Sequence, residues 1–463
     1  MVAVWIWLLS DPLGPSPYKA PICQRTPEST LRTTARFSLA VLVLLVACAP
    51  AEDDPIRSDV VEARQHYEAG MEFIESALGR PGADSAVIHF EAAVAADPDF
   101  AQAWAGLARA RVWLVSNFGM PGQLGPAIEA AARAEELEPD AVETQLARGY
   151  VAYRGHRDYD AALAEFLAAE EAGADDPEVA GAIGNIYRRQ GRLDDAVEYY
   201  ERRLTLNPEH TRGLVTLAQT YNAMGDQVAV LGVAERLGAL GDNRSPVWRF
   251  WAHLNSGDTT AAWEVIDDIE RAQDIEGEFS FFDMMHAVYA RDAGTLAMVP
   301  PSAFELGGWR FQLSQYVAAS DQVDEHSEAF DHWIAERTQL LDSVPGSESG
   351  AAIQRSNLHA QIAFLEALRG NADAAQAHAE QVEMLNATAL DMWSGMGDMF
   401  DVALAHLAIG NHDRALDIME AQLEFWPIGA AWLEMHPTFD PLRGNPRFDA
   451  LVAGSRAMER PVA

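Results

Sequence analysis

The stretch PEVAGAIGNIYRRQGRLDDAVEYYERRLTLNPEH, residues 177–210, decides the fold. Its small and apolar residues recur three and four apart on both sides of Gly191, which predicts two amphipathic helices joined by a short turn. Small Gly184 and Ala196 allow the two helices to approach closely, and Pro208 ends the second helix. A single pair of this kind cannot bury its apolar stripe alone, so the stretch predicts stacking on similar units.

The same turn recurs along the chain. A glycine is followed five residues later by alanine or valine, which opens an apolar helical stripe. The first steps between these glycines are 34 and 32 residues, a period that is typical of solenoids. The pairs are Gly191/Ala196, Gly225/Val230, Gly257/Ala262, Gly370/Ala375 and Gly410/Ala415.

This period and these positions resemble the tetratricopeptide repeat (TPR) family, over residues 67–270 and again over 356–425. The resemblance implies an all-α fold: a TPR-type α-solenoid, that is, a right-handed superhelix of antiparallel helix pairs. It also implies a protein that binds a protein or peptide partner. One alternative remains an enzyme whose site lies unrecognised in 276–355.

The repeats divide the chain into six segments. We expect an upstream extension and signal peptide at 1–47, an acidic tether at 48–58, an N-terminal TPR array at 59–275, degenerate helical repeats at 276–355, C-terminal TPR-like repeats at 356–435 and a cap at 436–463. The cap is expected to dock through Phe439, Leu442, Phe448 and Leu451. The aromatic residues of the degenerate segment either pack between helices or form a docking surface; they are Phe279, Phe281, Phe282, Trp309, Phe311, Tyr316, Phe330 and Trp333.

The N-terminal segment predicts where in the cell the protein is located. An apolar run at 37–47 follows Arg32 and Arg36, and its eleven residues are too few to span a bilayer, which indicates a signal peptide. Residues 45–48, LVAC, resemble the lipobox of bacterial lipoproteins, which implies a lipid anchor on Cys48 and cleavage before it. Ala49 favours the outer membrane, on its periplasmic side. The alternative is an ordinary secretory signal with an incidental cysteine, and a start codon near Leu31 would explain the upstream residues.

Composition excludes several function classes. The chain has 70 Asp and Glu against 33 Lys and Arg, a net charge of −37, which argues against nucleic acid as a partner. The only lysine is Lys19, and the only cysteines are Cys23 and Cys48, so the repeats hold no lysine or cysteine catalyst. The histidines form no HExxH pair. We expect no enzyme activity, no cofactor, no metal and no catalytic residues.

A binding surface is predicted on the first helices of the pairs, which line the concave groove in TPR arrays. The leading function is a lipid-anchored TPR scaffold for protein–protein interaction at the bacterial cell envelope. The alternative is a sensor for a peptide or small anionic ligand, because arginines suit carboxylate or phosphate recognition. The arginines would otherwise only complement helix dipoles. The sequence leaves the oligomeric state open. The expected groove residues are Arg109, Arg154, Asn185, Arg188, Arg189, Arg212, Gln219 and Asn222.

Overall fold

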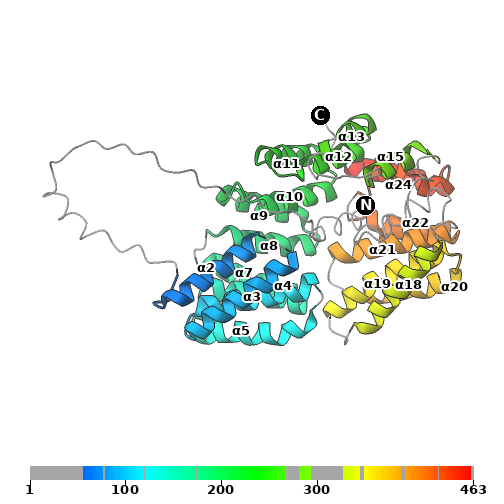
Figure 1. Ribbon diagram of the computed structural model, residues 1–463. Coiled ribbons are helices and arrows are strands. Elements are labelled where there is room, and N and C mark those ends of the chain that lie inside the picture. The colour runs from blue at the N-terminus through cyan, green and yellow to red at the C-terminus, as the bar shows by residue number, and fades with distance from the viewer. Residues whose placement is uncertain are drawn as a thin grey trace, which may run out of the picture.

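The computed structural model of the chain is a stack of helices (Figure 1). The described residues are all helix and connecting turns, with no β-strand among them. Cys48 and everything before residue 56 lie outside these residues. The structure describes residues 56–76, 79–118, 120–172, 175–266, 268–269, 281–292, 327–344, 349–386, 392–425 and 427–459.

Successive helices pack as antiparallel pairs, which confirms the all-α solenoid predicted from the repeat. The N-terminal pairs are α2 (Val61–Ser76) with α3 (Gly79–Ala96), α4 (Ala101–Phe118) with α5 (Leu124–Leu137), α6 (Val142–Tyr150) with α7 (Tyr159–Glu171), α8 (Pro177–Arg189) with α9 (Leu193–Leu206), α10 (Thr211–Ala223) with α11 (Gln227–Ala239) and α12 (Ser245–Ser256) with α13 (Thr259–Glu264).

The later helices continue the pairing. They are α15 (Phe281–Ala290), α18 (Ser327–Ser343), α19 (Ser349–Leu368) with α20 (Ala372–Asn386), α21 (Met392–Ala408) with α22 (His412–Leu423), and α23 (Ala430–Met435) with α24 (Pro446–Met458). Among the described residues, three short helical turns lie between these helices: η1 (Pro121–Gln123), the π-helical turn η2 (Val151–His156) and η6 (Pro437–Leu442).

The repeated glycine ends the first helix of a pair. Gly191, Gly225 and Gly257 have φ of 76°, 71° and 85°, the left-handed region that side chains with a Cβ disfavour. The next residue often starts the second helix: the Asp226 side chain accepts a hydrogen bond from Ala229 N at 3.0 Å. Because the residue that ends the first helix and the residue that begins the second are adjacent, the turn between the two helices is short.

The small residue of each first helix makes room for an aromatic ring of the second. A Cβ added to Gly184 would lie 2.8 Å from the Tyr200 ring, and one added to Gly149 would lie 2.3 Å from the Phe166 ring. Tyr200 and Phe166 are fully buried. These pairs of glycine and aromatic residue give the tight helix approach predicted from Gly184.

Both ends of the array are closed by short segments. Arg57 and Ser58, which the sequence assigns to the tether, contact the first pairs: Arg57 N donates to Gln102 and Ser58 Oγ to Asp97, at 2.7 and 2.5 Å. At the other end, all four predicted cap residues are buried in the same core as α22.

The solenoid turns back on itself, so that the helices lie in two columns (Figure 1). Helix α12 packs against α23, and α8 packs against α21. One hydrophobic core extends from Ala196 to Val452 and joins both columns. The repeat period alone predicts a single continuous superhelix and does not show this closure.

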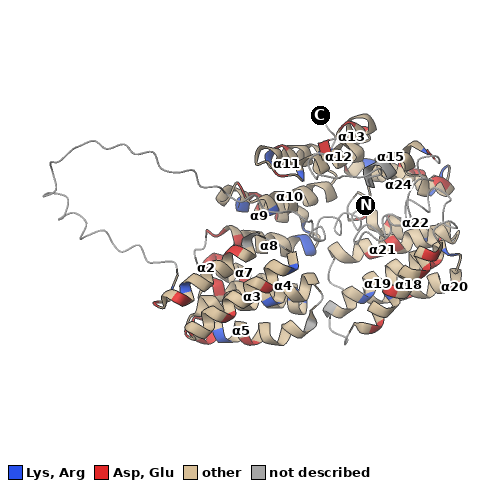
Figure 2. Cartoon of the chain, viewed as in Figure 1, with Lys and Arg blue, Asp and Glu red and all other residues tan. Residues whose placement is uncertain are grey.

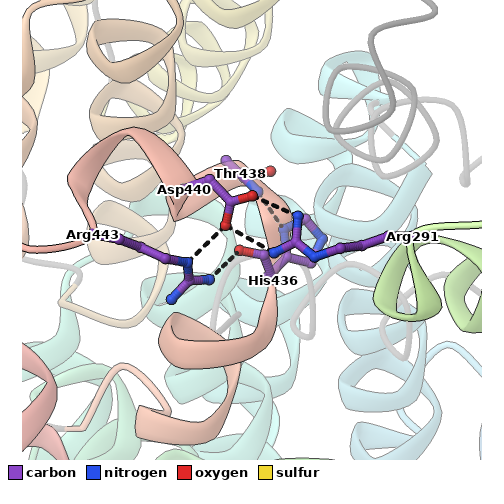
Figure 3. Close-up of polar contacts among 5 residues, drawn as sticks. All are labelled: Arg291, His436, Thr438, Asp440 and Arg443. Atoms are coloured by element: carbon purple, nitrogen blue, oxygen red, sulfur yellow. Dashed lines mark hydrogen bonds and ion pairs between the residues drawn. The ribbon is translucent and has the colours of Figure 1, made fainter.

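An ionic contact pins α15 to η6 across the turn-back (Figure 3). Arg291 donates through both terminal nitrogens to Asp440, at 2.5 and 2.9 Å, and Arg443 Nε donates to the same carboxylate at 2.7 Å. These two arginines lower the pKa of Asp440 to about 2, mainly through the hydrogen bond from Arg291.

The aromatic residues of the degenerate segment fall partly outside the described residues. Phe279, Trp309, Phe311 and Tyr316 lie outside, while Phe281 and Phe282 belong to α15. Phe330 and Trp333 on α18 are buried in the shared core. For these two, the packing alternative holds.

Candidate functional site: an arginine-lined inner face

The first helices α4, α6, α8 and α10, together with η2, form the surface that we call the inner face. Its central contact is an ion pair between Arg109 on α4 and Glu178 on α8. The Arg109 side chain is 7% exposed. Burial raises the pKa of Glu178, but Arg109 and Arg203 outweigh burial and hold it below its usual value. The pair therefore stays charged inside the array.

Arg154 lies beside this pair on η2. Its guanidinium is 5.5 and 5.6 Å from the ring centroids of Tyr150 and Tyr153. It donates to Ser116 Oγ at 3.3 Å and to Asn117 Oδ1 at 3.0 Å. Within the described part of the chain no carboxylate pairs with it, so its partners are neutral.

Arg203 reaches the same region from a second helix, α9. Its guanidinium lies over Gly181 of α8, where an added Cβ would be 2.4 Å from its Nη1. Nη2 lies 2.8 Å from His210 Nε2, and no carboxylate pairs with Arg203 among residues that are described. Reasoning from first-helix positions missed this residue. Gly181 and Gly213, which leave space beside it, were the available signal.

Arg212 on α10 completes the group that we call the arginine cluster, namely Arg109, Arg154, Arg203 and Arg212. Its guanidinium lies 5.1 Å from the Trp113 ring centroid. Burial, followed by repulsion from Arg154 and Arg203, lowers the pKa of Arg212 to about 10. That repulsion shows that the cluster concentrates positive charge in a chain with a net charge of −37.

Arg188 and Arg189 lie at the end of α8, where they contact the second column. The guanidinium of Arg188 is 4.5 Å from the Trp393 ring centroid, and Arg189 Nη1 donates to Ser394 Oγ at 2.8 Å. We call these four residues the seam. In Figure 2 the basic end of α8 faces α21.

The seam and the cluster are electrostatically continuous through Tyr153. Burial alone would raise the pKa of Tyr153, but Arg189, Arg154 and Arg188 lower it to about 8. Arg154 acts on both Tyr153 and Arg212. The structure thus brings five of the predicted arginines together and adds Arg203.

The predicted amides of the inner face bind neighbouring side chains of the chain itself. Tyr200 OH donates to Asn185 Oδ1 at 2.9 Å, and Arg188 Nη1 donates to Gln219 Oε1 at 3.0 Å. Asn255 Nδ2 donates to Asn222 Oδ1 at 2.8 Å. These amide side chains therefore hold neighbouring helices of the inner face in position and do not project from its surface.

Two arginines elsewhere in the protein contrast with Arg154 and Arg203. Arg202, the neighbour of Arg203, pairs with Glu170 and with Asp175 on the outer side of α9. Arg447 pairs with Asp417 at 2.6 Å. Arg154 and Arg203 differ from Arg202 and Arg447 in having only neutral partners among the described residues.

Two further features of the described residues concern metal ligands and membrane-spanning helices. No three or more His, Cys, Asp or Glu residues there gather as metal ligands. No helix within the described ranges has the length and apolar character to cross a membrane.

Residues 180–212 match the sequence profile of the tetratricopeptide repeat family. This stretch is a tetratricopeptide repeat. It coincides with α8, α9 and the start of α10, the helices that carry Arg188, Arg189, Arg203 and Arg212. No curated protein matches the chain.

Solved structures with similar architecture include PilW, described as a widely conserved type IV pilus biogenesis factor, at 17% identity. The match covers 47% of this chain and 96% of PilW, with a TM-score of 0.37. PilF of Pseudomonas aeruginosa is 18% identical over 46% of this chain and 93% of PilF, with a TM-score of 0.34. A Rap protein complexed with competence and sporulation factor is 11% identical over 79% of this chain and 96% of that protein, with a TM-score of 0.42.

Proposed function

We propose that this TPR protein is a non-enzymatic interaction scaffold whose inner face binds an acidic segment of a protein partner. The observation that carries the proposal is the arginine cluster, in which Arg154 and Arg203 have no carboxylate partner among the described residues. A partner's carboxylates would supply the missing charge.

The energetics favour contact with an acid in spite of the negative net charge. Screening limits long-range repulsion to roughly 8 Å at physiological ionic strength. At contact, each hydrogen bond between a guanidinium and a carboxylate contributes about 1.5–3 kcal/mol. Two or three such bonds are enough to select an acidic segment.

The second part of the proposal is the location of the protein in the cell. The LVAC motif supports lipidation of Cys48 and attachment to the bacterial envelope, with the outer membrane favoured by Ala49. One lipidated cysteine that carries more than one acyl chain gives durable anchoring. The repeats would then hold the partner next to the membrane.

Capture from detergent-solubilised membranes tests the binding proposal. The double variant Arg154→Ala, Arg203→Ala should lose at least tenfold of the partner that the unchanged chain captures. The matched control is Arg202→Ala, which removes a guanidinium one position away that already pairs with Glu170 and Asp175. Equal capture by the double variant and the control would contradict the proposal.

Membrane fractionation tests the address. Cys48→Ser should leave the protein uncleaved or soluble, and metabolic labelling with a radioactive fatty acid should mark only the unchanged chain. A Cys48→Ser protein that is cut at the usual site and still sediments with membranes would contradict lipid anchoring.

A small anionic ligand is the second candidate, favoured by the dense charge around half-buried Arg212. It predicts a thermal shift with a small dicarboxylate or with phosphate in the absence of any protein partner. A stoichiometric protein in the capture experiment, without such a shift, favours the scaffold.

A further inference from the structure

We propose that His210 and Arg203 form a subsite for one carboxylate of the partner, in which both side chains donate hydrogen bonds to the same group. This subsite rests on the proposed function and deepens it, because it names the residues that hold an acidic side chain. Arg203 belongs to the second helix α9, and His210 caps α10. Neither residue stands at a first-helix position from which the groove was predicted.

The hydrogen bond that His210 accepts fixes which of its nitrogens carries a proton. Gly213 N donates to His210 Nδ1 at 2.7 Å, in the first turn of α10. A backbone amide can only donate, so Nδ1 is the acceptor of the ring. Burial, followed by repulsion from Arg203 and Arg212, lowers the pKa of His210 to about 4, and the ring is therefore neutral at pH 7. Because a neutral imidazole has one acceptor nitrogen and one N–H, Nε2 carries the proton.

Arg203 meets this proton with another donor. Its Nη2 lies 2.8 Å from His210 Nε2. A guanidinium has five N–H donors and no acceptor, so neither group accepts from the other. The opposite tautomer would only move the conflict to Gly213 N, which the helix holds in place, whereas Arg203 ends a flexible side chain. An oxygen atom that accepts from both nitrogens would replace this contact with two hydrogen bonds.

A second donor of Arg203 also lacks an acceptor. Its Nε is buried and has no hydrogen-bond partner in the described part of the chain. Nε–H and one Nη2–H point along the same edge of a guanidinium and can bind the two oxygens of one carboxylate. Elsewhere in this protein that edge holds an acid. Arg447 Nε and Nη2 donate to the two oxygens of Glu420 at 2.9 and 2.7 Å, and Arg244 binds Asp242 in the same way at 2.8 and 2.5 Å.

The acid of the inner face already has its own partners. Glu178 pairs with Arg109 and accepts a hydrogen bond from Tyr150. Arg203 lowers the pKa of Glu178 by its charge but forms no ion pair with it. A carboxylate on the His210 side of Arg203 therefore comes from a bound molecule. Its oxygen fits when the two nitrogens separate to about 4.5 Å, the span of two hydrogen bonds that meet at one atom.

Binding of a fluorescent capped peptide, GEEDEEG, to the full chain tests the subsite. His210→Asn keeps a side chain that can cap α10, because asparagine accepts from the same amide, but it removes the Nε2–H donor. This variant should bind the peptide about tenfold more weakly by fluorescence anisotropy. The matched control is His332→Asn, the same substitution at an exposed position on α18, which should bind as the unchanged chain does.

A double-mutant cycle without peptide tests the contact between the two donors. Urea denaturation compares His210→Asn, Arg203→Ala and the double variant with the unchanged chain. Two facing donors predict a coupling free energy that is zero or unfavourable to folding, and His210→Asn alone should leave the midpoint unchanged. A coupling that stabilises the folded chain would mean that His210 accepts a hydrogen bond from Arg203, and it would overturn the proposal.

The outcomes distinguish the subsite from the proposed function. If His210→Asn binds the peptide as tightly as the unchanged chain, or if no form binds it, the subsite is wrong. Loss of partner capture by the Arg154→Ala, Arg203→Ala variant would then still support the scaffold. If glutarate, a free dicarboxylate, binds as tightly as the peptide and loses about tenfold in His210→Asn, the subsite stands. Its carboxylate then belongs to a small ligand and not to a protein segment.

Discussion

Gly181 decides where the guanidinium of Arg203 lies. A Cβ at this position would be 2.4 Å from Arg203 Nη1, the far end of a flexible side chain. Gly181→Ala should therefore displace Arg203 from the cluster and weaken partner capture several-fold, while the free energy of unfolding changes by less than about 1 kcal/mol. Capture and urea denaturation measure the two effects.

Gly184→Ala is the informative comparison, because its Cβ would meet the Tyr200 ring at 2.8 Å and the Ala196 carbonyl at 3.3 Å. Neither can move freely in the packed core, so overpacking should cost about 1–3 kcal/mol. Equal loss of stability in Gly181→Ala and Gly184→Ala would contradict the positioning role of Gly181.

Arg109 and Glu178 form the buried ion pair of the inner face. Arg109→Ala leaves a carboxylate that is only 30% exposed without its nearest cation. The loss of folding free energy should be about 3 kcal/mol, the low end for a broken buried pair, since Arg203 still acts on Glu178. Arg133→Ala, which removes an exposed pair with Asp99, should cost less than about 1 kcal/mol. If the two variants lose similar free energies of unfolding, the buried ion pair of Arg109 contributes no more to stability than an exposed one.

The sequence predicted the inner-face arginines of first helices but not Arg203. Arg202 and Arg203 are adjacent and chemically identical, yet one step along α9 turns the side chain by about 100° around the helix, toward different partners. Arg202 meets outer acids, and Arg203 passes over Gly181. A repeat pattern predicts on which face of a helix the Cα atom of a residue lies. The long side chain of an arginine can extend beyond that face. Lipidation of Cys48 stays a prediction.

At the scale of elements, glycine has two opposite effects. Gly410 ends α21 with φ of 80° in open space, so Gly410→Ala should cost about 1 kcal/mol through backbone strain alone. Gly232 lies exposed within α11, also in open space, and Gly232→Ala should stabilise by about 0.5–1 kcal/mol. Urea denaturation that gives the same sign for both would contradict this account of the repeat turn.

Helix pairing was predictable because the residues that form each turn and each contact between paired helices lie within one repeat. Gly191, Gly225 and Gly257 adopt the left-handed turn, and Gly184 packs against Tyr200 within one repeat. The turn-back was not predictable. It depends on contacts between distant segments, such as Arg291 with Asp440, that no 34-residue period encodes.

At the scale of the whole molecule, the two columns act as one body because they share a core and the ionic contact of Figure 3. The seam lies on the side of the first column that faces the second. Helix α8 therefore carries both Glu178 of the inner face and the contact with the second column.

Buried histidines make the folding stability of this protein depend on pH. Burial lowers the pKa of five histidines below the ordinary 6.5, most of all that of His436, to about 3. The unfolded chain therefore binds more protons than the folded one below pH 6.5, and folding stability falls as the pH drops through that range. Asp401 opposes this, because burial raises its pKa well above the usual value. The other four histidines are His210, His359, His378 and His406.

Five histidines outweigh the raised carboxyl groups Asp401, Glu165 and Glu459, so the net slope of unfolding free energy against pH should be positive between pH 4 and 6. His436→Asn removes one of these sites while keeping a side chain that can accept the hydrogen bond from Thr438 N. Its slope, from urea denaturation at several pH values, should fall by about one proton. An unchanged slope would mean that His436 is protonated in the folded protein, and the closed packing of Tyr289 and Trp432 around it would then be wrong.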